Sequence, residues 1–416
     1  MTTQNNIQAG YKDSSVGVIP QEWEVKRIKD ICNIDADSLT ARTSPDYEFE
    51  YISLSDVDGD SFDITTSHQI FKYAPSRARR IVKKGDVVIS TVRPNLQGFF
   101  LVKDDKKDLV VSTGFSVLTP ICCDSQYLLS CFFSSIIGKQ FYSLVVGSNY
   151  PAVNSSDVAK LKLPIPPIEE QRKIAEILRA WDEAIDKQCR LIERLEERKR
   201  VLMQRLLTGR MRIHGFNTPL QKVKLSEIFK ERNETRCENL PLLSITADKG
   251  VILQSESDKK DTSNEDKSKY KRICPNDIGY NTMRMWQGRS ALSSLEGIVS
   301  PAYTIVTPKV ELDMRFISEL IKQPRVVYDF WTHSQGLVGD TLNCKFHDFS
   351  QVRVLLPSLS EQKAIAEVLA TADYEIVAHR KKLDSLRKQK RGLMQQLLTG
   401  KTRVKIRTYE YITTKN

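Results

Sequence analysis

Two short segments hold side chains whose types suit the recognition of DNA bases better than the breaking of bonds. GDVVISTVRPNLQG, from Gly85, aligns with DIGYNTMRMWQG, from Asp277, and the alignment matches Arg93 with Arg284. Arginine can form two hydrogen bonds to the edge of guanine, and asparagine or glutamine can form two to the edge of adenine. The polar candidates in these segments are Thr91, Arg93, Asn95, Gln97, Asn281, Thr282, Arg284 and Gln287. A buried arginine paired with a carboxylate is the competing interpretation, and the presence of the arginine in both segments favours a shared backbone or structural role.

Basic runs precede both segments and add candidate contacts to phosphates. SRARRIVKKGD begins at Ser76 and KSKYKRICPND begins at Lys267. Cations beside a turn can bind phosphates, which fixes a protein's position on DNA without reading the base sequence. An equal alternative is that these basic runs form a solvated edge of the domain without a ligand. Trp286 either stacks on a base or belongs to the core. The loops GSNYPAVN and HSQGLVG occupy equivalent positions before the two long helices and are further candidates to face the ligand. These additional candidates are Arg77, Arg79, Arg80, Lys83, Lys84, Asn149, Tyr150, Lys271, Arg272, Trp286, Arg289 and Gln335.

The sequence lacks the motifs of the common catalytic and cofactor sites. It contains no GxxxxGKS/T phosphate loop, no GxSxG, HExxH or GxGxxG, and no Asn-Pro-Pro-aromatic tetrapeptide of amino-methyltransferases. PDYEFE at Pro45 resembles a nuclease carboxylate pair, but a lysine at the required spacing is absent. We therefore expect a binding protein with no catalytic residue, no metal site and no cofactor on this chain.

The composition agrees with a multidomain globular protein that has a polyanionic partner. The 416 residues carry 63 Lys and Arg against 52 Asp and Glu, a formal net charge of +11. The eight cysteines form no CxxC pair, which indicates reduced thiols in the cytoplasm. No signal peptide is recognisable, and the most apolar stretch, YLLSCFFSSIIG, is too short and too polar to cross a membrane.

An internal duplication organises the whole chain. LMQRLLTG, from Leu202, returns as LMQQLLTG, from Leu393, and Gln171 likewise matches Gln362, each pair being 191 residues apart. Each copy begins after a proline-bearing segment and ends at Thr-Gly, as helices commonly do. From Arg172 to Leu206 such a helix extends roughly 50 Å at about 1.5 Å per residue.

Apolar residues recur in both copies at steps of four and three, the pattern of a coiled-coil seam. Gln188 and Lys199 interrupt the first seam at the layers where His379 and Lys390 interrupt the second. A partly exposed seam residue is the preferred interpretation of His379 over a ligand or a pH switch. The predicted helix–helix contacts are Ile174, Leu178, Trp181, Ile185, Gln188, Ile192, Leu195, Leu202, Ile365, Leu369, Ile376, His379, Leu383, Leu386 and Leu393.

The remaining residues form two blocks that are distant copies of each other. Strands are expected at residues 87–92, 98–102 and 115–119, and helices at 127–145 and 316–334. Because compact domains commonly have neighbouring termini, the second long helix is expected to run antiparallel to the first. The predicted fold is α+β: two mixed α/β domains separated by two long antiparallel coiled-coil helices, with an internal pseudo-two-fold duplication.

With two divergent domains, each followed by an IPPIEEQRKIAEIL-type helix that ends in LLTG, the chain resembles the specificity subunits of type I restriction-modification systems. TMRMWQG with GIVSPAY is similar to a recurrent signature of that family. The resemblance covers nearly the whole chain and implies target-recognition domains at 1–160 and 214–354. It implies conserved helical spacers at 161–213 and 355–404, with a C-terminal tail at 405–416.

The resemblance further implies that each target-recognition domain reads one half of a bipartite, asymmetric site in double-stranded DNA, while the helices set the spacing. It implies two modification subunits that use S-adenosylmethionine to methylate adenine, and restriction or motor subunits that use ATP and magnesium. Exposed faces near the helix starts are expected to dock partners, with capping of the helix as the competing role; these residues are Glu169, Glu170, Gln171, Glu361 and Gln362.

Two other functions remain as alternatives. A fused enzyme, with catalytic and specificity parts in one chain, is disfavoured by the missing methyltransferase motif. A coiled-coil protein-interaction scaffold without DNA readout leaves the paired arginines unexplained. The charged segment at residues 254–271 is expected to be flexible without DNA.

Overall fold

The chain, in a computed structural model, divides into two compact units that each contain half of both long helices. The described residues are 8–57, 64–105, 108–144, 152–246, 249–257, 261, 263–336 and 342–405. The first unit comprises Met1–Cys189 with Lys382–Asn416, and the second comprises Arg190–Lys381. Asn149 and Tyr150 lie outside the described residues, as does nearly all of the predicted C-terminal tail.

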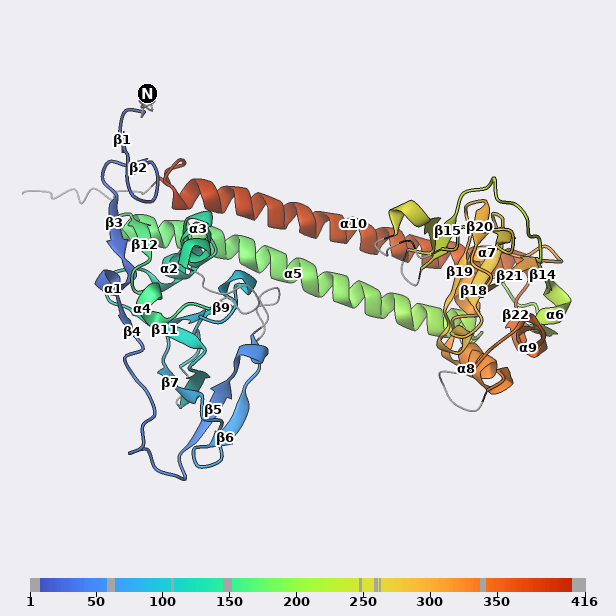
Figure 1. Cartoon of the computed structure of the whole chain (residues 1–416), viewed down its shortest axis with the longest axis horizontal. Coiled ribbons are helices and arrows are strands. Elements are labelled where there is room, and N and C mark those ends of the chain that lie inside the picture. The colour runs from blue at the N-terminus through green and yellow to red at the C-terminus, as the bar shows by residue number, and fades with distance from the viewer. Residues whose placement is uncertain are drawn as a thin grey trace, which may run out of the picture. The chain divides into compact units, whose positions relative to one another are not determined.

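The first unit is a mixed α/β domain joined to helix ends (Figure 1). Its strands form two four-stranded sheets, ordered β4-β11-β8-β9 and β6-β5-β10-β7, and the pairs β12-β3 and β1-β2. The strands are β1 (Tyr11–Lys12), β2 (Ile19–Pro20), β3 (Glu24–Arg27), β4 (Cys32–Ile34), β5 (Glu48–Ile52), β6 (Ser67–Ile70), β7 (Ala78–Val82), β8 (Val87–Ser90), β9 (Phe99–Leu101), β10 (Leu109–Ser112), β11 (Phe115–Pro120) and β12 (Lys162–Ile165). The short helices are α1 (Ile28–Ile31), η1 (Leu54–Asp56), η2 (Pro94–Leu96), α2 (Ser125–Phe132), α3 (Ser135–Leu144) and α4 (Ser155–Val158).

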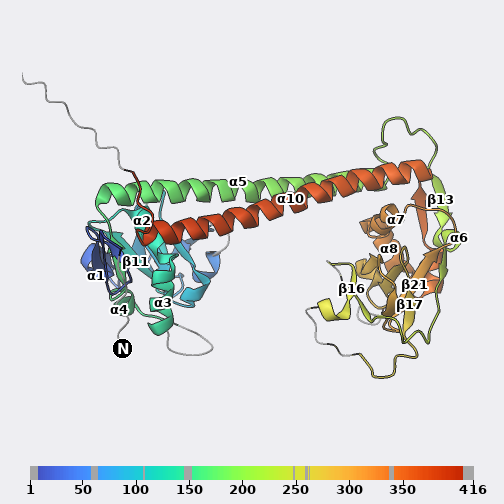
Figure 2. The same ribbon diagram turned by 90° about the horizontal axis from the view of Figure 1, so that it is seen from above.

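The second unit repeats this design with a four-stranded sheet ordered β14-β21-β18-β19 and with the pairs β13-β22, β15-β16 and β17-β20. Figure 2 shows α7 and α8 beside these strands. Its strands are β13 (Gln221–Lys224), β14 (Phe229–Glu231), β15 (Leu243–Ile245), β16 (Val251–Leu253), β17 (Lys271–Ile273), β18 (Ile278–Asn281), β19 (Ser290–Leu292), β20 (Gly297–Val299), β21 (Tyr303–Pro308) and β22 (Arg353–Leu356). Its short helices are α6 (Leu225–Ile228), η3 (Gln254–Glu256), η4 (Met285–Gln287), α7 (Met314–Leu320), α8 (Pro324–His333) and α9 (Phe346–Gln351).

The central strand of each four-stranded repeat sheet is buried on both faces. All of β8 is buried, and its β-branched residues pair with β11 in the antiparallel register Val88↔Val117. In β18, Ile278 pairs with Val306 of β21 in the same way. Continuous β-branched runs are typical of strands covered on both sides, so the sequence specifies these positions well.

The long helices are α5 (Ile168–Leu207) and α10 (Leu359–Leu398). Both end before a glycine in the left-handed region, Gly209 at φ +71° and Gly400 at φ +69°, as a helix C-cap requires. A Cβ at Gly209 would collide with Leu220, and one at Gly400 would collide with Pro20. The duplicated Thr-Gly is therefore a structural stop signal in both copies.

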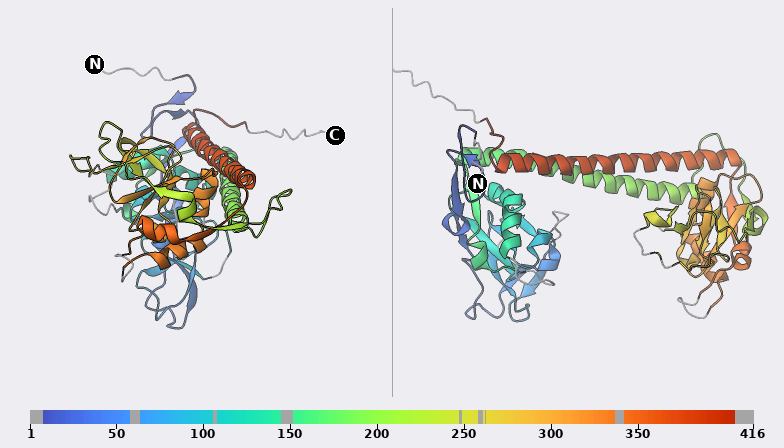
Figure 3. Two further views of the ribbon diagram at one scale, coloured as in Figure 1. Left: turned by 90° about the vertical axis from the view of Figure 1, so that its right-hand side faces the viewer. Right: turned by 45° about the horizontal axis from the view of Figure 1, so that its top comes forward.

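Within each unit, one half of α5 lies beside one half of α10 in antiparallel orientation (Figure 3). In the first unit, Ile174 and Leu178 share a core with Leu397, whereas in the second Leu206 shares a core with Ile365. The predicted α+β fold is confirmed. The predicted seam residues that are buried are Ile174, Leu178, Ile185, Gln188, Ile192, Leu195, Ile365, Leu369 and Ile376. Those that are half-buried are Trp181, Leu202, His379, Leu383, Leu386 and Leu393.

Two predicted helices are wrong in extent, because each is interrupted. The expected helix at 127–145 is divided into α2 and α3, and the expected helix at 316–334 into α7 and α8. Pro324 occupies the first position of α8, where its missing N–H costs nothing, and it cannot continue α7. Ser134 turns its hydroxyl back to the Cys131 carbonyl oxygen at 2.6 Å, which accompanies the break in the first unit.

All eight cysteines are free thiols. No helix in the described part of the chain is long and apolar enough to cross a bilayer. Among the same residues, no group of three His, Cys, Asp or Glu side chains is arranged to hold a metal ion.

Candidate nucleic-acid interface

The first arginine turn, residues 91–98, follows the buried strand β8. Thr91 is buried, and its hydroxyl donates to the Gly114 carbonyl oxygen at 2.8 Å, which anchors the turn. Arg93 and Gln97 both adopt left-handed backbone conformations, at φ +49° and +54°. Such a conformation costs a residue with a side chain roughly 1 kcal/mol, so this turn is held by its surroundings. The side chains of Arg93, Asn95 and Gln97 are exposed.

The second arginine turn, residues 282–288, follows β18 and has its own internal hydrogen bonds. The Asn281 side-chain oxygen accepts from the Met283 amide at 3.0 Å, and the Trp286 indole donates to the Met283 carbonyl oxygen at 2.9 Å. Thr282 donates to the Ala302 carbonyl oxygen at 3.3 Å. Arg284 is exposed. Both aligned arginines therefore lie at the protein surface, which contradicts the alternative of a buried structural arginine.

An aspartate just before each central strand closes the turn that precedes the strand. Asp86 accepts from Thr119 Oγ1 at 2.7 Å and from the Lys83 amide at 2.9 Å, and burial raises the pKa of its carboxyl. Asp277 accepts from Arg232 Nε at 2.7 Å and from the Cys274 amide at 2.8 Å. The two aligned aspartates therefore have the same structural role, and their hydrogen bonds are made within the protein.

Some residues of the first basic run are engaged within the protein. Arg80 pairs with Asp35 at 2.9 Å, and its burial lowers the pKa of the guanidinium. Arg79 lies over the Phe71 ring at 4.9 Å, and Lys83 approaches Asp37 at 3.7 Å on the surface. The contacts of Arg80 favour a structural role. The exposed cations of this run are Arg77, Lys83 and Lys84.

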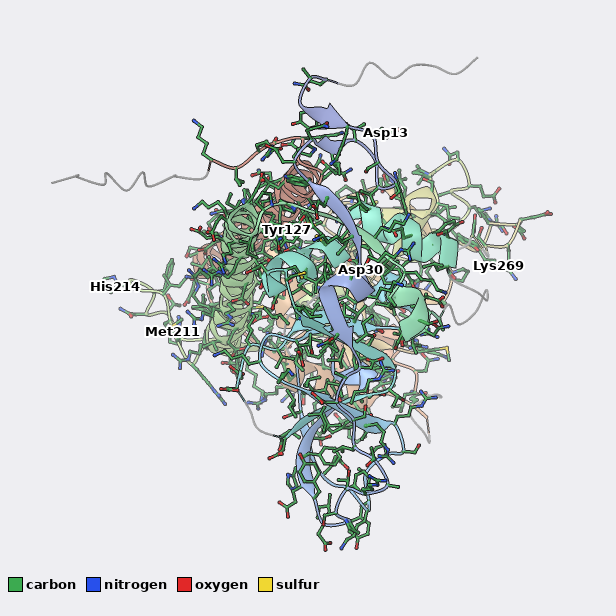
Figure 4. All side chains as sticks on the ribbon, turned by 90° about the vertical axis from the view of Figure 1, so that its left-hand side faces the viewer. Asp13, Asp30, Tyr127, Met211, His214 and Lys269 are labelled. Atoms are coloured by element: carbon green, nitrogen blue, oxygen red, sulfur yellow. The ribbon has the colours of Figure 1, made fainter. Side chains whose placement is uncertain are left out.

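The second basic run is largely neutralised by carboxylates. Lys271 pairs with Glu231 at 3.5 Å. Arg272 pairs with Glu296 and with Glu234, and these hydrogen bonds raise the pKa of its guanidinium. Lys269, in the same run, projects outward (Figure 4) and is exposed. A cation already held by two carboxylates offers less to a phosphate, so Arg272 is a weaker candidate than its position suggested.

The remaining candidates lie around the second arginine turn. Gln287 and Arg289 are exposed, and Trp286 is half-buried. Gln335 is exposed, and its amide donates to Asp348 Oδ1 at 3.1 Å. These residues come from the turn and from the segment after α8, whereas Lys271 and Arg272 belong to the separate sheet β17-β20.

The predicted exposure of the helix starts is wrong for four of the five residues. Glu169 is exposed, but Glu170 and Glu361 are fully buried, and Gln171 and Gln362 are almost so. Sequence periodicity could not show this, because the partners that bury them come from distant segments. These four side chains make hydrogen bonds inside the protein.

Each buried glutamate is held by an arginine that follows the other long helix. Arg403 Nε donates to Glu170 Oε1 at 2.7 Å, and Trp23 Nε1 donates to Glu170 Oε2 at 3.0 Å. In the second unit, Arg212 Nε donates to Glu361 Oε1 at 2.7 Å. We call Arg403–Glu170 and Arg212–Glu361 the helix-end ion pairs.

Each buried glutamine connects a long helix to its neighbouring domain. Gln171 accepts from the Asp124 amide at 2.9 Å and donates to the Pro166 carbonyl oxygen at 2.8 Å. Asp124 in turn caps α2 by accepting from the amide of Tyr127, a residue labelled in Figure 4. Gln362 likewise accepts from the amide of Asp313, the residue that caps α7, at 3.1 Å. The same glutamine link thus positions the domain helix in both units.

Two of the ion pairs that join α5 to α10 involve seam lysines, and sequence analysis missed them. Lys199 Nζ lies 2.7 Å from Asp373, and Lys390 pairs with Asp182. The four residues form one duplicated arrangement, since both lysines and both aspartates are 191 residues apart. The two lysines at matching seam layers were visible in the sequence. Their partners could not be identified from it, because the register of α5 against α10 was unknown.

Comparison with known proteins gives consistent matches. A family profile described as the type I restriction modification DNA specificity domain matches residues 20–197. A putative type I restriction enzyme MjaX specificity subunit of Methanocaldococcus jannaschii is 26% identical, over 96% of this chain and 98% of that protein. The type I restriction enzyme HindI specificity subunit of Haemophilus influenzae is 29% identical over 30% of this chain and 28% of that protein.

Solved structures share the fold. The HsdS subunit from Thermoanaerobacter tengcongensis matches with a TM-score of 0.52 and 21% identity, over 92% of this chain and 98% of that one. A chain from a study of complex assembly and conformational transition of the type I R-M system matches with a TM-score of 0.65 and 22% identity, over 92% of this chain and 99% of that one.

Proposed function

Because this chain belongs to the DNA specificity subunits of type I restriction-modification systems, we propose that each of its two domains reads one half of a bipartite, asymmetric DNA site. The chain is a non-catalytic recognition subunit. The observation that carries the proposal is the duplicated turn: an exposed arginine follows the central buried strand in both domains. Exposed arginine suits guanine edges and phosphates alike.

The two arginine turns differ in the residues around the arginine, which supports two different half-sites. Pro94 and Asn95 follow Arg93, whereas Met285 and Trp286 follow Arg284. The backbone also differs, because Arg93 is left-handed and Arg284, at φ −132°, is not. A shared scaffold with divergent turns suits the recognition of unlike sequences on an asymmetric site.

We assign the long helices to the spacing between half-sites and to partner docking. α5 contains 40 residues, which at about 1.5 Å per residue extends roughly 60 Å, more than one turn of B-DNA at about 34–36 Å. The domain limits 1–160, 161–213, 214–354, 355–404 and 405–416 remain our division of the chain. Glu169 stays a docking candidate. The four buried residues, Glu170, Gln171, Glu361 and Gln362, instead stabilise the starts of the two helices.

The chemistry belongs to the partners in this proposal. Two modification subunits would bind S-adenosylmethionine and methylate adenine, and restriction subunits would use ATP and magnesium. DNA in the cell is the substrate, so the complex would act in the cytoplasm.

The test is a map of methylated adenines in cells that express this chain with its cognate modification subunit, compared with cells that express the modification subunit alone. A split motif with a fixed gap, present only with this chain, is the expected result. If assembly with the modification subunit is verified and no new methylation occurs, the DNA-reading role is wrong and the protein-interaction scaffold is the better account.

A further inference from the structure

An exposed aromatic residue occupies the same position on one helix of each domain. α3 and α8 both contain ten residues, and the buried Phe141 of α3 corresponds to the buried Phe330 of α8. The next residue is an aromatic in both cases: Tyr142 is 89% exposed and Trp331 is 47% exposed. Large aromatics usually bury their rings, and two of them exposed at equivalent positions in diverged copies call for a common cause.

Both helices pack against the arginine turns. α3 lies against η2 of the first turn, and α8 lies against η4 of the second. Val327 of α8 closely approaches Gly288, at 3.2 Å from the position that a Cβ would take there. Trp331 follows Val327 by one helical turn and therefore lies along the same side of α8. Trp331 thus borders the second arginine turn, and Tyr142 belongs to the helix that packs against the first.

The surroundings of these aromatics are cationic and partly apolar. Lys139 is exposed one turn before Tyr142, and α3 contains no acidic residue. At the second turn, Arg284 and Arg289 are exposed, and so is the side chain of Met283. α8 carries one acid, Asp329, against Arg325.

This combination favours nucleic acid over protein as the occupant. Exposed aromatic rings among cations are the usual composition of surfaces that stack bases and hold the phosphate chain. The core of a protein–protein interface is instead depleted of charge. Net positive charge at both patches complements DNA and would repel a basic partner surface.

We propose that Tyr142 and Trp331 are DNA-contacting residues, each stacking its ring on a base face in the half-site that its own domain reads. Methyltransferases extrude their target base from the duplex, which exposes the faces of the neighbouring bases. A ring placed beside the arginine turn would cover such a face and stabilise the opened DNA. This inference rests on the proposed function and adds two residues to it.

The test compares Tyr142→Ala and Trp331→Ala with Tyr142→Phe and Trp331→Phe in the complete complex with the modification subunits. Affinity for a duplex that contains the mapped site is measured by fluorescence anisotropy across a salt series. Stacking on one base contributes about 1–3 kcal/mol, so each alanine variant should bind at least about fivefold more weakly. The phenylalanine variants should retain most of the affinity, and the slope of log affinity against log salt should not change, because no phosphate contact is lost.

The matched control is Tyr374→Ala, since Tyr374 is an exposed aromatic on α10 outside both patches, with 76% of its surface exposed, between the values for Tyr142 and Trp331. Its DNA affinity should equal that of the unmodified complex. Unchanged affinity in both patch alanine variants would overturn the proposal, and weaker assembly with normal DNA affinity would assign the patches to a protein partner. If the unmodified complex itself neither binds nor methylates a split site, the proposed function fails first, and the two failures are thereby distinguished.

Discussion

At the residue scale, the helix-end ion pairs show how two segments far apart in the chain stabilise each other. Glu170 is fully buried, and its carboxylate receives hydrogen bonds from Arg403 and Trp23. A buried carboxylate is tolerated only when it is paired and hydrogen-bonded. Arg403, which follows α10, is therefore part of the first unit's structure.

Arg403→Ala should lower the stability of the first unit by about 2–3 kcal/mol. Loss of one partner of a buried pair typically costs about 3–5 kcal/mol, and the half-exposed guanidinium reduces this figure. Hydrogen exchange of the complete chain measures the effect, with faster exchange expected in β3 and β12 and normal exchange in the second unit. Arg198→Ala, which removes an exposed ion pair with Glu375, is the control and should change stability by less than about 1 kcal/mol. Equal effects of the two substitutions would contradict this role for Arg403.

Arg284→Ala should weaken DNA binding by about 1–3 kcal/mol and reduce methylation at the half-site read by the second domain. Arg284→Lys should restore part of the affinity but less of the base preference, because lysine lacks the planar fork of donors. Anisotropy with single-base variants of the site measures both quantities. Methylation that is unchanged in Arg284→Ala would remove this residue from the interface.

The arginine turns were predictable from the sequence, whereas the roles of the helix-start acids were not. Arg93 follows a strand that β-branched residues specify, and Arg284 stands at the same register in the second copy. Glu170 looks like an ordinary first-turn acid, and its partner Arg403 lies 233 residues further on. Only the three-dimensional pairing of the chain brings such residues together, so the predicted exposure was wrong there.

At the element scale, α5 and α10 combine an apolar seam with two ion pairs made by half-buried lysines. Lys390 and Asp182 keep about a fifth of their side-chain surface exposed, and they connect the helices within the first unit. Lys199 pairs with Asp373 in the second unit, where the aspartate side chain is more exposed, at 55%. Polar pairs inside a seam disfavour shifted registers, because a shift would leave them unpaired.

Lys390→Asp should destabilise the helix pair by about 1–3 kcal/mol, since it places two half-buried carboxylates together. Adding Asp182→Lys should recover most of the loss by reversing the pair. The thermal midpoint of the assembled complex reports both variants. Lys173→Asp with Glu176→Lys, an exposed pair within one helix, is the control and should show little change. A double variant that is no more stable than Lys390→Asp would show that the pair does not connect the helices.

The periodicity of the sequence predicted the long helices and their caps, but it did not predict where shorter helices break. A single helix was expected at residues 127–145 and another at residues 316–334. Pro324 marks the second break, and the serine turn at Ser134 marks the first through a side-chain hydrogen bond that a pattern does not reveal.

At the scale of the whole molecule, we propose that the duplication divides recognition from spacing. Each unit holds one domain with the adjoining ends of both long helices, and each helix runs from one unit into the other. A change in helix length should therefore alter the distance between the readers without altering the arginine turns. The deletion that tests this best removes one heptad from each helix, because it preserves the seam.

Residues 186–192 and 377–383 are the matching heptads, and both lie between the Lys390–Asp182 and Lys199–Asp373 pairs. Their removal shortens each helix by about 10 Å, equivalent to at most about three base pairs at roughly 3.4 Å each. The decisive measurement is a methylated-adenine map in cells that express this deletion variant with the modification subunit. Our account predicts the same two half-sites separated by a shorter gap. Unchanged spacing, or different bases in either half-site, would contradict it.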